Sequence, residues 1–150
     1  MRSILSTPVA QVTRPGLVTI DESVSLRAAA RHLAAQRVGA AVALRGSRPI
    51  GLLSERDITE RLGAGVDADR DTVSDAMSAP LIVADWGATV GEVLQQMADE
   101  GVRHLPVLGS DGHLAGMSSL AELLALVVKD ETMLDLRPRS DSEGASGFFG

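Results

Sequence analysis

An internal repeat constrains the fold of this chain more than any other feature of its sequence. Asp21 recurs 64 positions later as Asp85, and the order of apolar and polar residues around the two acids also matches. After the next turn the spacing becomes 65, which aligns Gly-Leu-Leu-Ser-Glu-Arg-Asp at 51–57 with Gly-Met-Ser-Ser-Leu-Ala-Glu at 116–122. One residue inserted at a turn is a change that folds tolerate. The chain is therefore two copies of one structural unit.

The residue pattern of each copy predicts the same order of elements, namely strand, helix, strand, strand and helix. Apolar residues recur at helical spacing after Ser25 and after Thr89, and each helix is followed by two short apolar runs separated by turn residues. The final helices begin at Ser54 and Ser119. Neither copy is long enough to bury both faces of its own sheet. We therefore expect an α/β fold in which two β-α-β-β-α repeats pack back to back.

The ends of the central helix in each copy carry recognisable signals. Ser25 and Thr89 are typical N-caps, and Thr89 with Glu92 predicts a capping box. Gly101 is expected to close the second of these helices, and Gly39 to do the same near the end of the first.

The repeat divides the chain into three segments. We expect a first repeat with its N-terminal lead-in at residues 1–66, a second repeat at 67–129 and a flexible tail at 130–150. A short helix is predicted at 72–77, before Pro80. The tail is low in apolar residues, and its Phe148-Phe149 pair either docks on a neighbour or ends a loose segment.

Composition excludes several classes of function. A formal net charge of −6 argues against a nucleic-acid platform, so any anion site has to be local and built from placed Arg residues and helix ends. Cysteine is absent, which removes disulfides, thiolate metal sites and cysteine nucleophiles. No apolar run approaches the ~18 residues of a membrane span, and the N-terminus does not resemble a signal peptide. We expect a soluble cytoplasmic protein with no membrane or nucleic-acid partner.

The repeated serine and carboxylate have two interpretations. In the structural one, Ser54 with Asp57 and Ser119 with Glu122 cap their helices, the second pair being the better match to a capping box. In the functional one, the free N–H groups at the helix start seat a phosphate, and the carboxylate accepts hydrogen bonds from two ribose hydroxyls. Forked Arg side chains would add positive charge for the phosphates. Those arginines are Arg56 and Arg103.

The doubled motifs resemble those of the CBS (cystathionine-beta-synthase) domain family. The matching stretches are His-Leu-Pro-Val at 104–107, Gly-apolar-apolar-Ser-x-x-Asp at 51–57, and Ser-Asp-Ala-Met at 74–77 followed by Pro80. The resemblance covers roughly residues 4 to 128. It implies two repeats related by a pseudo-twofold axis and packed sheet to sheet, with ligand clefts between them, and association as a flat homodimer.

The resemblance also implies a ligand and its contacts. The clefts of the family commonly bind AMP, ADP, ATP, S-adenosylmethionine or a dinucleotide such as NAD, and no obligatory cofactor or metal is expected. Asp57 takes the place of the ribose-binding acid, and Ser54 that of its neighbouring hydroxyl. His104 stands where a family residue faces the cleft. The ligand-binding residues implied are Val18, Thr19, Ala40, Ala41, Val42, Ser54, Arg56, Asp57, Val83, Ala84, Arg103, His104, Leu105, Pro106, Ser119 and Glu122.

The second copy departs from the family pattern. Glu122 is one methylene longer than the usual Asp, Ser118 replaces an apolar residue, and Val42 stands where the second repeat has Pro106. A base would have to lie between aliphatic groups, since no Tyr or Phe is available there. We expect the site with Asp57 to be the better one.

Other residues suggest no chemistry of their own. His32, His104 and His113 have no metal-ligand spacing, the acids between 67 and 75 lack the EF-hand order, and Trp86 is expected to pack over the start of the second copy's helix. No base with an orienting partner is present for catalysis. The favoured hypothesis is a regulatory, non-enzymatic adenosine-ligand sensor. The alternatives are a structural dimerisation and protein-partner module, which uses its helices or tail, and a nucleotide hydrolase.

Overall fold

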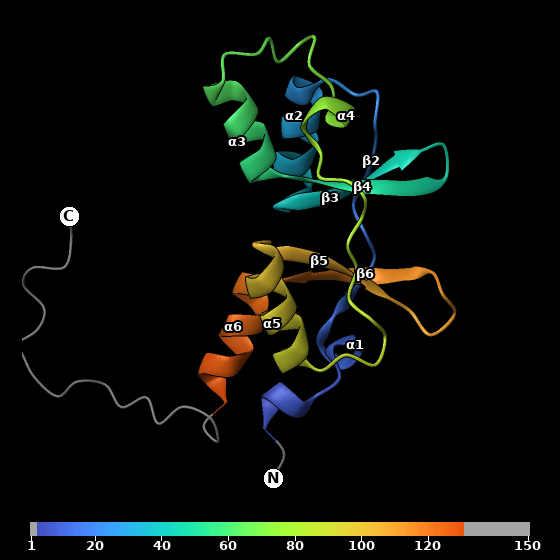
Figure 1. Cartoon of the computed structure of the whole chain (residues 1–150), viewed down its shortest axis with the longest axis vertical. Coiled ribbons are helices and arrows are strands. Elements are labelled where there is room, and N and C mark those ends of the chain that lie inside the picture. The colour runs from blue at the N-terminus through green and yellow to red at the C-terminus, as the bar shows by residue number, and fades with distance from the viewer. Residues whose placement is uncertain (1–2, 131–150) are drawn as a thin grey trace, which may run out of the picture.

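The computed structural model describes residues 3–130 and contains two three-stranded sheets that face each other, each covered on its outer side by helices (Figure 1). This confirms the α/β fold of two repeats packed sheet to sheet. The first repeat contains β2 (Thr19–Asp21), α2 (Leu26–Gln36), β3 (Ala40–Arg45), β4 (Arg48–Ser54) and α3 (Glu55–Gly63). The second contains α5 (Val90–Glu100), β5 (His104–Leu108), β6 (Leu114–Ser119) and α6 (Leu120–Lys129).

The two sheets differ in their third strand. In the first, β2 runs parallel to β3, and β3 is antiparallel to β4. In the second, β5 and β6 are antiparallel, and the short β1 (Arg14–Pro15) adds to the far edge of β6. The strand expected at the start of the second repeat is reduced to one bridge, in which Ala84 pairs in parallel with Val107. The second sheet therefore takes its third strand from the start of the chain.

The lead-in of each repeat packs on the other repeat. Before the first repeat come the turn η1 (Ile4–Ser6) and α1 (Val9–Val12), and before the second comes α4 (Val73–Ala76). The Val9 N–H donates to the Ala88 carbonyl at 2.8 Å, and the Val73 N–H donates to the Val24 carbonyl at 2.9 Å. Both valines are completely buried, each in the core of the repeat that it does not introduce. This exchange ties the two halves together.

The two glycines of the repeated motif make room for this crossing. A Cβ on Gly51 would stand 2.7 Å from the Ser78 carbonyl oxygen, in the segment that leads into the second repeat. A Cβ on Gly116 would overlap the Arg14 carbonyl oxygen, in the segment that leads into the first. Glycine at both positions therefore lets the lead-in of each repeat pass close to the strand.

Some of the helix ends lie at the residues that the sequence predicted, and one does not. Ser25 and Thr89 are N-caps, and Gly101 closes α5 in the left-handed conformation at φ +67°. At the end of α2, however, the left-handed residue is Arg37, at φ +56°, and not Gly39. The helix ends before it reaches Gly39, which instead makes room for the side chain of His104.

One further difference from the sequence expectation concerns the cap of α5. The Glu92 carboxylate accepts a hydrogen bond from the Thr89 hydroxyl rather than from the Thr89 backbone, so the expected capping box is incomplete. Within residues 3–130, no helix has the length and apolar character that crossing a membrane requires. The predicted tail, apart from Asp130, lies outside the described residues.

Candidate functional site

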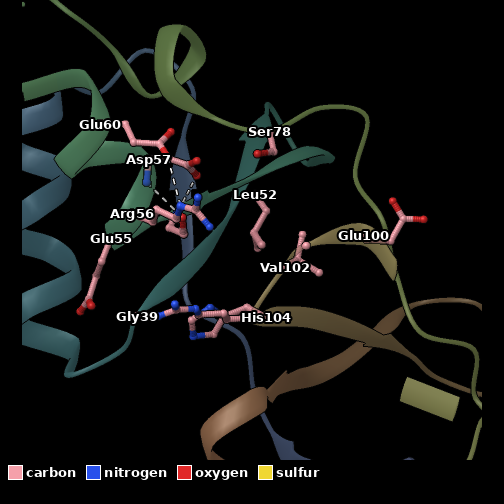
Figure 2. A pocket seen from close by; sticks show the side chains of 13 residues that line it. Gly39, Leu52, Glu55, Arg56, Asp57, Glu60, Ser78, Glu100, Val102 and His104 are labelled. Carbon is pink, nitrogen blue, oxygen red and sulfur yellow. Dashed lines mark hydrogen bonds and ion pairs between the residues drawn. The ribbon is translucent and has the colours of Figure 1, made fainter. Parts of the chain in front are cut away.

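A cleft of about 370 Å³ lies between the two repeats, beside the start of α3 (Figure 2). One wall comes from β4 and α3 of the first repeat, and the other from the segment that joins α5 to β5 in the second. Its lining residues are Gly39, Leu52, Ser54, Glu55, Arg56, Asp57, Glu60, Ser78, Glu100, Gly101, Val102, Arg103 and His104.

Ser54 and Asp57 form a complete capping box at the start of α3. The Asp57 N–H donates to Ser54 Oγ at 3.2 Å, and the Ser54 N–H donates to Asp57 Oδ2 at 2.8 Å. The structural interpretation of this motif is therefore confirmed for the first repeat. Asp57 Oδ1 accepts no hydrogen bond from any described residue, so one carboxylate oxygen is left for a ligand in the cleft.

The start of α3 offers fewer free N–H groups than the sequence suggested. The Ser54 and Asp57 amides are used by the capping box, and the Glu55 N–H donates to the Gly39 carbonyl at 2.9 Å. A helix N-terminus attracts phosphate chiefly through unsatisfied N–H groups. This terminus is therefore a weaker phosphate seat than expected.

Acidic side chains outnumber basic ones around the cleft. Its lining carries four carboxylates, on Glu55, Asp57, Glu60 and Glu100, against the guanidinium groups of Arg56 and Arg103. Arg56 Nε lies 3.0 Å from Glu60 Oε1, which further reduces its charge toward a ligand. The local field thus disfavours a ligand with several negative charges.

His104 is the half-buried residue of the second repeat that reaches Gly39. Its Nε2 lies 2.9 Å from the position that a Cβ on Gly39 would take, so a larger residue at position 39 would collide with the imidazole. Burial lowers the pKa of His104, and the nearby carboxylates of Glu55 and Glu122 oppose that shift. The imidazole is therefore biased toward its neutral form.

The structure brings together five of the sixteen residues implied by the resemblance, while the other eleven lie outside this cleft. Those in the cleft are Ser54, Arg56, Asp57, Arg103 and His104. Six of the others are buried in or beside the sheets, namely Ala40, Ala41, Val42, Ala84, Leu105 and Pro106. Val18 is half-buried, Thr19 is exposed, and Val83 lines a separate groove beside α5.

Sequence reasoning missed eight lining residues. They are Gly39, Leu52, Glu55, Glu60, Ser78, Glu100, Gly101 and Val102. Glu60 follows Arg56 by one helical turn, a spacing visible in the sequence. Glu100 and Val102 reach the cleft only because of the way the two repeats pack, and no local sequence pattern indicates this.

The second copy of the motif lies outside the cleft. Ser119 Oγ accepts the Glu122 N–H at 3.1 Å, but the Glu122 carboxylate accepts nothing from the Ser119 backbone. Glu122 is exposed. The prediction that this pair is the better capping box was wrong, because the reciprocal bond from the Ser119 N–H to the Glu122 carboxylate is not formed.

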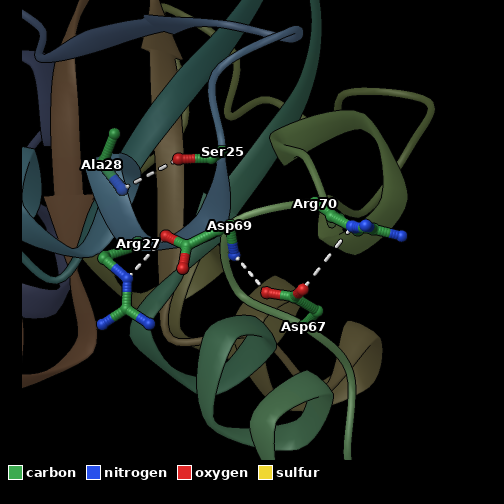
Figure 3. Close-up of polar contacts among 6 residues, drawn as sticks. All are labelled: Ser25, Arg27, Ala28, Asp67, Asp69 and Arg70. Carbon is green, nitrogen blue, oxygen red and sulfur yellow. Dashed lines mark hydrogen bonds and ion pairs between the residues drawn. The ribbon is translucent and has the colours of Figure 1, made fainter.

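The remaining candidates have structural explanations. In the acidic loop, Asp69 pairs with Arg27 at 2.6 Å, and Asp67 lies 3.7 Å from Arg70 (Figure 3). Trp86, in the turn before α5, is 47% exposed, and it lines a groove together with Ala88 and Glu92 at the start of that helix. No three His, Cys, Asp or Glu side chains within residues 3–130 are placed to hold a metal ion.

Known proteins resemble this chain in sequence and in fold. A protein of Methanopyrus kandleri is 28% identical over 126 residues, 83% of this chain and 63% of the relative, so the chain spans less than two thirds of that protein. A protein with CBS domains from Burkholderia ambifaria is 25% identical, with a TM-score of 0.77 over 83% of this chain and 96% of its own.

A third similarity concerns the fold alone. The CBS domain pair of MJ0100, solved with 5′-methylthioadenosine and S-adenosyl-L-methionine, is 18% identical with a TM-score of 0.71, over 80% of this chain and 94% of its own. The CBS domain itself matches residues 9–64 and 73–129, which together are most of the sequence. This chain belongs to the CBS domain family, as a tandem pair.

Proposed function

We propose that the cleft beside α3 is a regulatory site for an adenosine-containing ligand and that the protein catalyses no reaction on it. The observation that carries the proposal is Asp57, whose Oδ2 is held by the Ser54 N–H while Oδ1 accepts nothing from the described chain and lines the cleft. A carboxylate fixed in this way is suited to vicinal ribose hydroxyls, because an ionised acceptor binds a donor about twice as strongly as a neutral one.

Charge favours a particular form of the ligand. With four carboxylates against two guanidinium groups, and with three N–H groups of the α3 terminus already engaged, a polyphosphate gains little here. A neutral or cationic group at the ribose 5′ position meets a complementary field. S-adenosylmethionine and 5′-methylthioadenosine, the ligands of the MJ0100 pair, have such groups, whereas ATP does not.

Regulation would follow from where the cleft lies. Its two walls belong to different repeats, so a bound ligand stabilises whichever relative placement of the repeats closes on it. The shift in that equilibrium is limited by the difference in affinity between the two placements. No chemical step is needed for this role.

Thermal unfolding with AMP, ATP, S-adenosylmethionine and 5′-methylthioadenosine tests the proposal. A ligand at about 100 times its dissociation constant stabilises the folded state by about 2.7 kcal/mol. We expect the stabilisation in wild type, its loss in Asp57→Asn, and its retention in Glu122→Gln, the matched change outside the cleft. If no adenosine compound raises the melting temperature, or if both variants respond like wild type, the proposal is wrong.

Self-association is a second candidate role, and α6 favours it. Leu124 and Val128 on this helix are 45% and 52% exposed, and together they form an apolar strip that a second copy can cover. We propose a homodimer through this face. Light scattering of the Leu124→Glu/Val128→Glu variant should show a monomer where wild type shows a dimer, and equal masses would exclude this interface.

A further inference from the structure

A second hollow lies on the second repeat, between α5 and the turn that precedes it. It has a volume of about 770 Å³, which is larger than the cleft between the repeats. We call it the α5 groove, and its lining residues are Val83, Asp85, Trp86, Gly87, Ala88, Glu92, Gln95, Gln96, Asp99 and Glu100. Only Glu100 is shared with the cleft beside α3.

The α5 groove is strongly acidic, and its charge is not neutralised within the described chain. Its four carboxylates, on Asp85, Glu92, Asp99 and Glu100, form no ion pair with any residue between 3 and 130, and all five ion pairs of that region lie between residues 22 and 71. Hydrogen bonds from Gln95 to Asp99 and from Thr89 to Glu92 leave the negative charges in place.

Sequence charge follows the same division. Residues 73–130 contain eight acidic residues but only Arg103 and Lys129 as cations, whereas residues 3–72 contain nine arginines and eight acids. Excess charge on one repeat creates a directed field that attracts a cationic partner and speeds its association. Within residues 3–130, the excess of negative charge therefore lies in the repeat that carries the α5 groove.

An exposed indole stands among these acids. Trp86 is 47% exposed and is the only tryptophan, and Ile82, just before the groove, is 37% exposed. Exposed aromatic surface is what a protein partner buries, and an indole face attracts Arg and Lys by a cation–π interaction. The groove thus offers both apolar contact and charge complementarity to one kind of side chain.

We propose that the α5 groove docks an extended segment of a partner protein that carries Arg or Lys side chains. Trp86 receives the guanidinium or the aliphatic stem of a basic residue, and Asp85 and Asp99 pair with its neighbours. The side-chain carbonyl oxygens of Gln95 and Gln96, whose amide nitrogens already donate within the chain, accept hydrogen bonds from the segment. The exposed surfaces of Trp86 and Ile82 offer apolar contact that a small polyamine uses poorly, which favours a peptide. This role is independent of any ligand in the cleft beside α3.

Fluorescence provides a direct test, because Trp86 is the only tryptophan and the chain has no tyrosine. The probe is the peptide acetyl-Gly-Arg-Gly-Arg-Gly-Arg-amide, and its counterpart with citrulline in place of arginine serves as the uncharged control. We expect a saturable change in Trp86 emission with the arginine peptide that weakens as NaCl is raised, and no change with the citrulline peptide.

Two charge-matched variants separate the groove from the overall charge. Asp85→Asn/Asp99→Asn should weaken binding about fivefold, since exposed pairs contribute up to ~1 kcal/mol each. Asp67→Asn/Asp111→Asn changes net charge equally on other surfaces and should bind like wild type. Equal weakening in both variants, an unchanged Trp86 emission, or spermidine binding as tightly as the peptide would each overturn the proposal.

Discussion

The imidazole of His104 occupies the space that a side chain on Gly39 would need, with its Nε2 2.9 Å from the position of the missing Cβ. Gly39 belongs to the first repeat and His104 to the second, and both line the cleft beside α3. The glycine therefore allows the two repeats to approach each other at the cleft.

Substitution of Gly39 by alanine should displace the imidazole without unfolding the protein. The methyl group meets the end of a side chain, which can rotate, rather than backbone. We expect the pKa of His104, which burial lowers, to rise toward its usual value as the ring moves into the more open cleft. NMR titration of the imidazole protons measures this, with His104→Gln assigning the signal. Gly63→Ala is the control, because nothing lies within 4 Å of a Cβ at that position, and it should leave the titration unchanged. An unchanged titration in Gly39→Ala would show that the contact between Gly39 and His104 is not formed.

The stability of the protein should depend on pH through the same side chain. Because the folded state holds the pKa of His104 below 6.5, the unfolded chain takes up the proton first as the pH falls. The free energy of unfolding should therefore decrease as the pH is lowered from 8 through 6.5, and the His104 contribution should level off below its folded pKa. Urea unfolding between pH 5.5 and 8 measures the slope.

Variants assign that slope to one histidine. His104→Gln should flatten it, while His113→Gln, at an exposed position, should keep it. An equal slope in wild type and His104→Gln would contradict the assignment.

Patterns local to each copy predicted the fold, whereas contacts between the copies escaped prediction. The repeat and the N-caps at Ser25 and Thr89 follow from short-range chemistry. That Val9 fills the core of the second repeat depends on the crossing of the lead-ins, which leaves no periodic signal.

The candidate site was predicted less completely than the fold. Asp57 and His104 were identified through the family motifs, whereas Glu60 and Glu100, which set the charge of the cleft, were not. Whether an acid faces a cleft depends on the packing of two repeats, because a solvated acid and a lining acid look alike in sequence. The left-handed residue at the end of α2 was misplaced for a related reason, since Gly39 is required by His104 and not by the helix.

Ser118 should stabilise the second sheet through one buried hydrogen bond. Its hydroxyl donates to the Leu105 carbonyl at 2.7 Å, and the residue is only 3% exposed. Ser118→Ala should therefore lower the free energy of unfolding by about 1 kcal/mol. Chemical denaturation measures the loss, and the exposed Ser110→Ala should change it by less than about 0.5 kcal/mol. Equal values for the two variants would show that the bond contributes no net stability.

The two repeated carboxylates should differ in their contribution to stability, in an order opposite to that suggested by their match to the capping-box motif. Asp57 Oδ2 accepts the Ser54 N–H at 2.8 Å in a partly buried setting, while Glu122 accepts no bond from the Ser119 backbone. Asp57→Ala removes that acceptor and should cost about 1 kcal/mol. Glu122→Ala loses only the attraction of an exposed charge to the start of α6 and should cost about 0.3–0.5 kcal/mol. Urea unfolding without ligand compares them, and Asp57→Asn, which keeps an oxygen at the acceptor position, should fall between the two. A larger loss in Glu122→Ala would mean that the second box closes in solution and that Asp57 is not held for a ligand by its own cap.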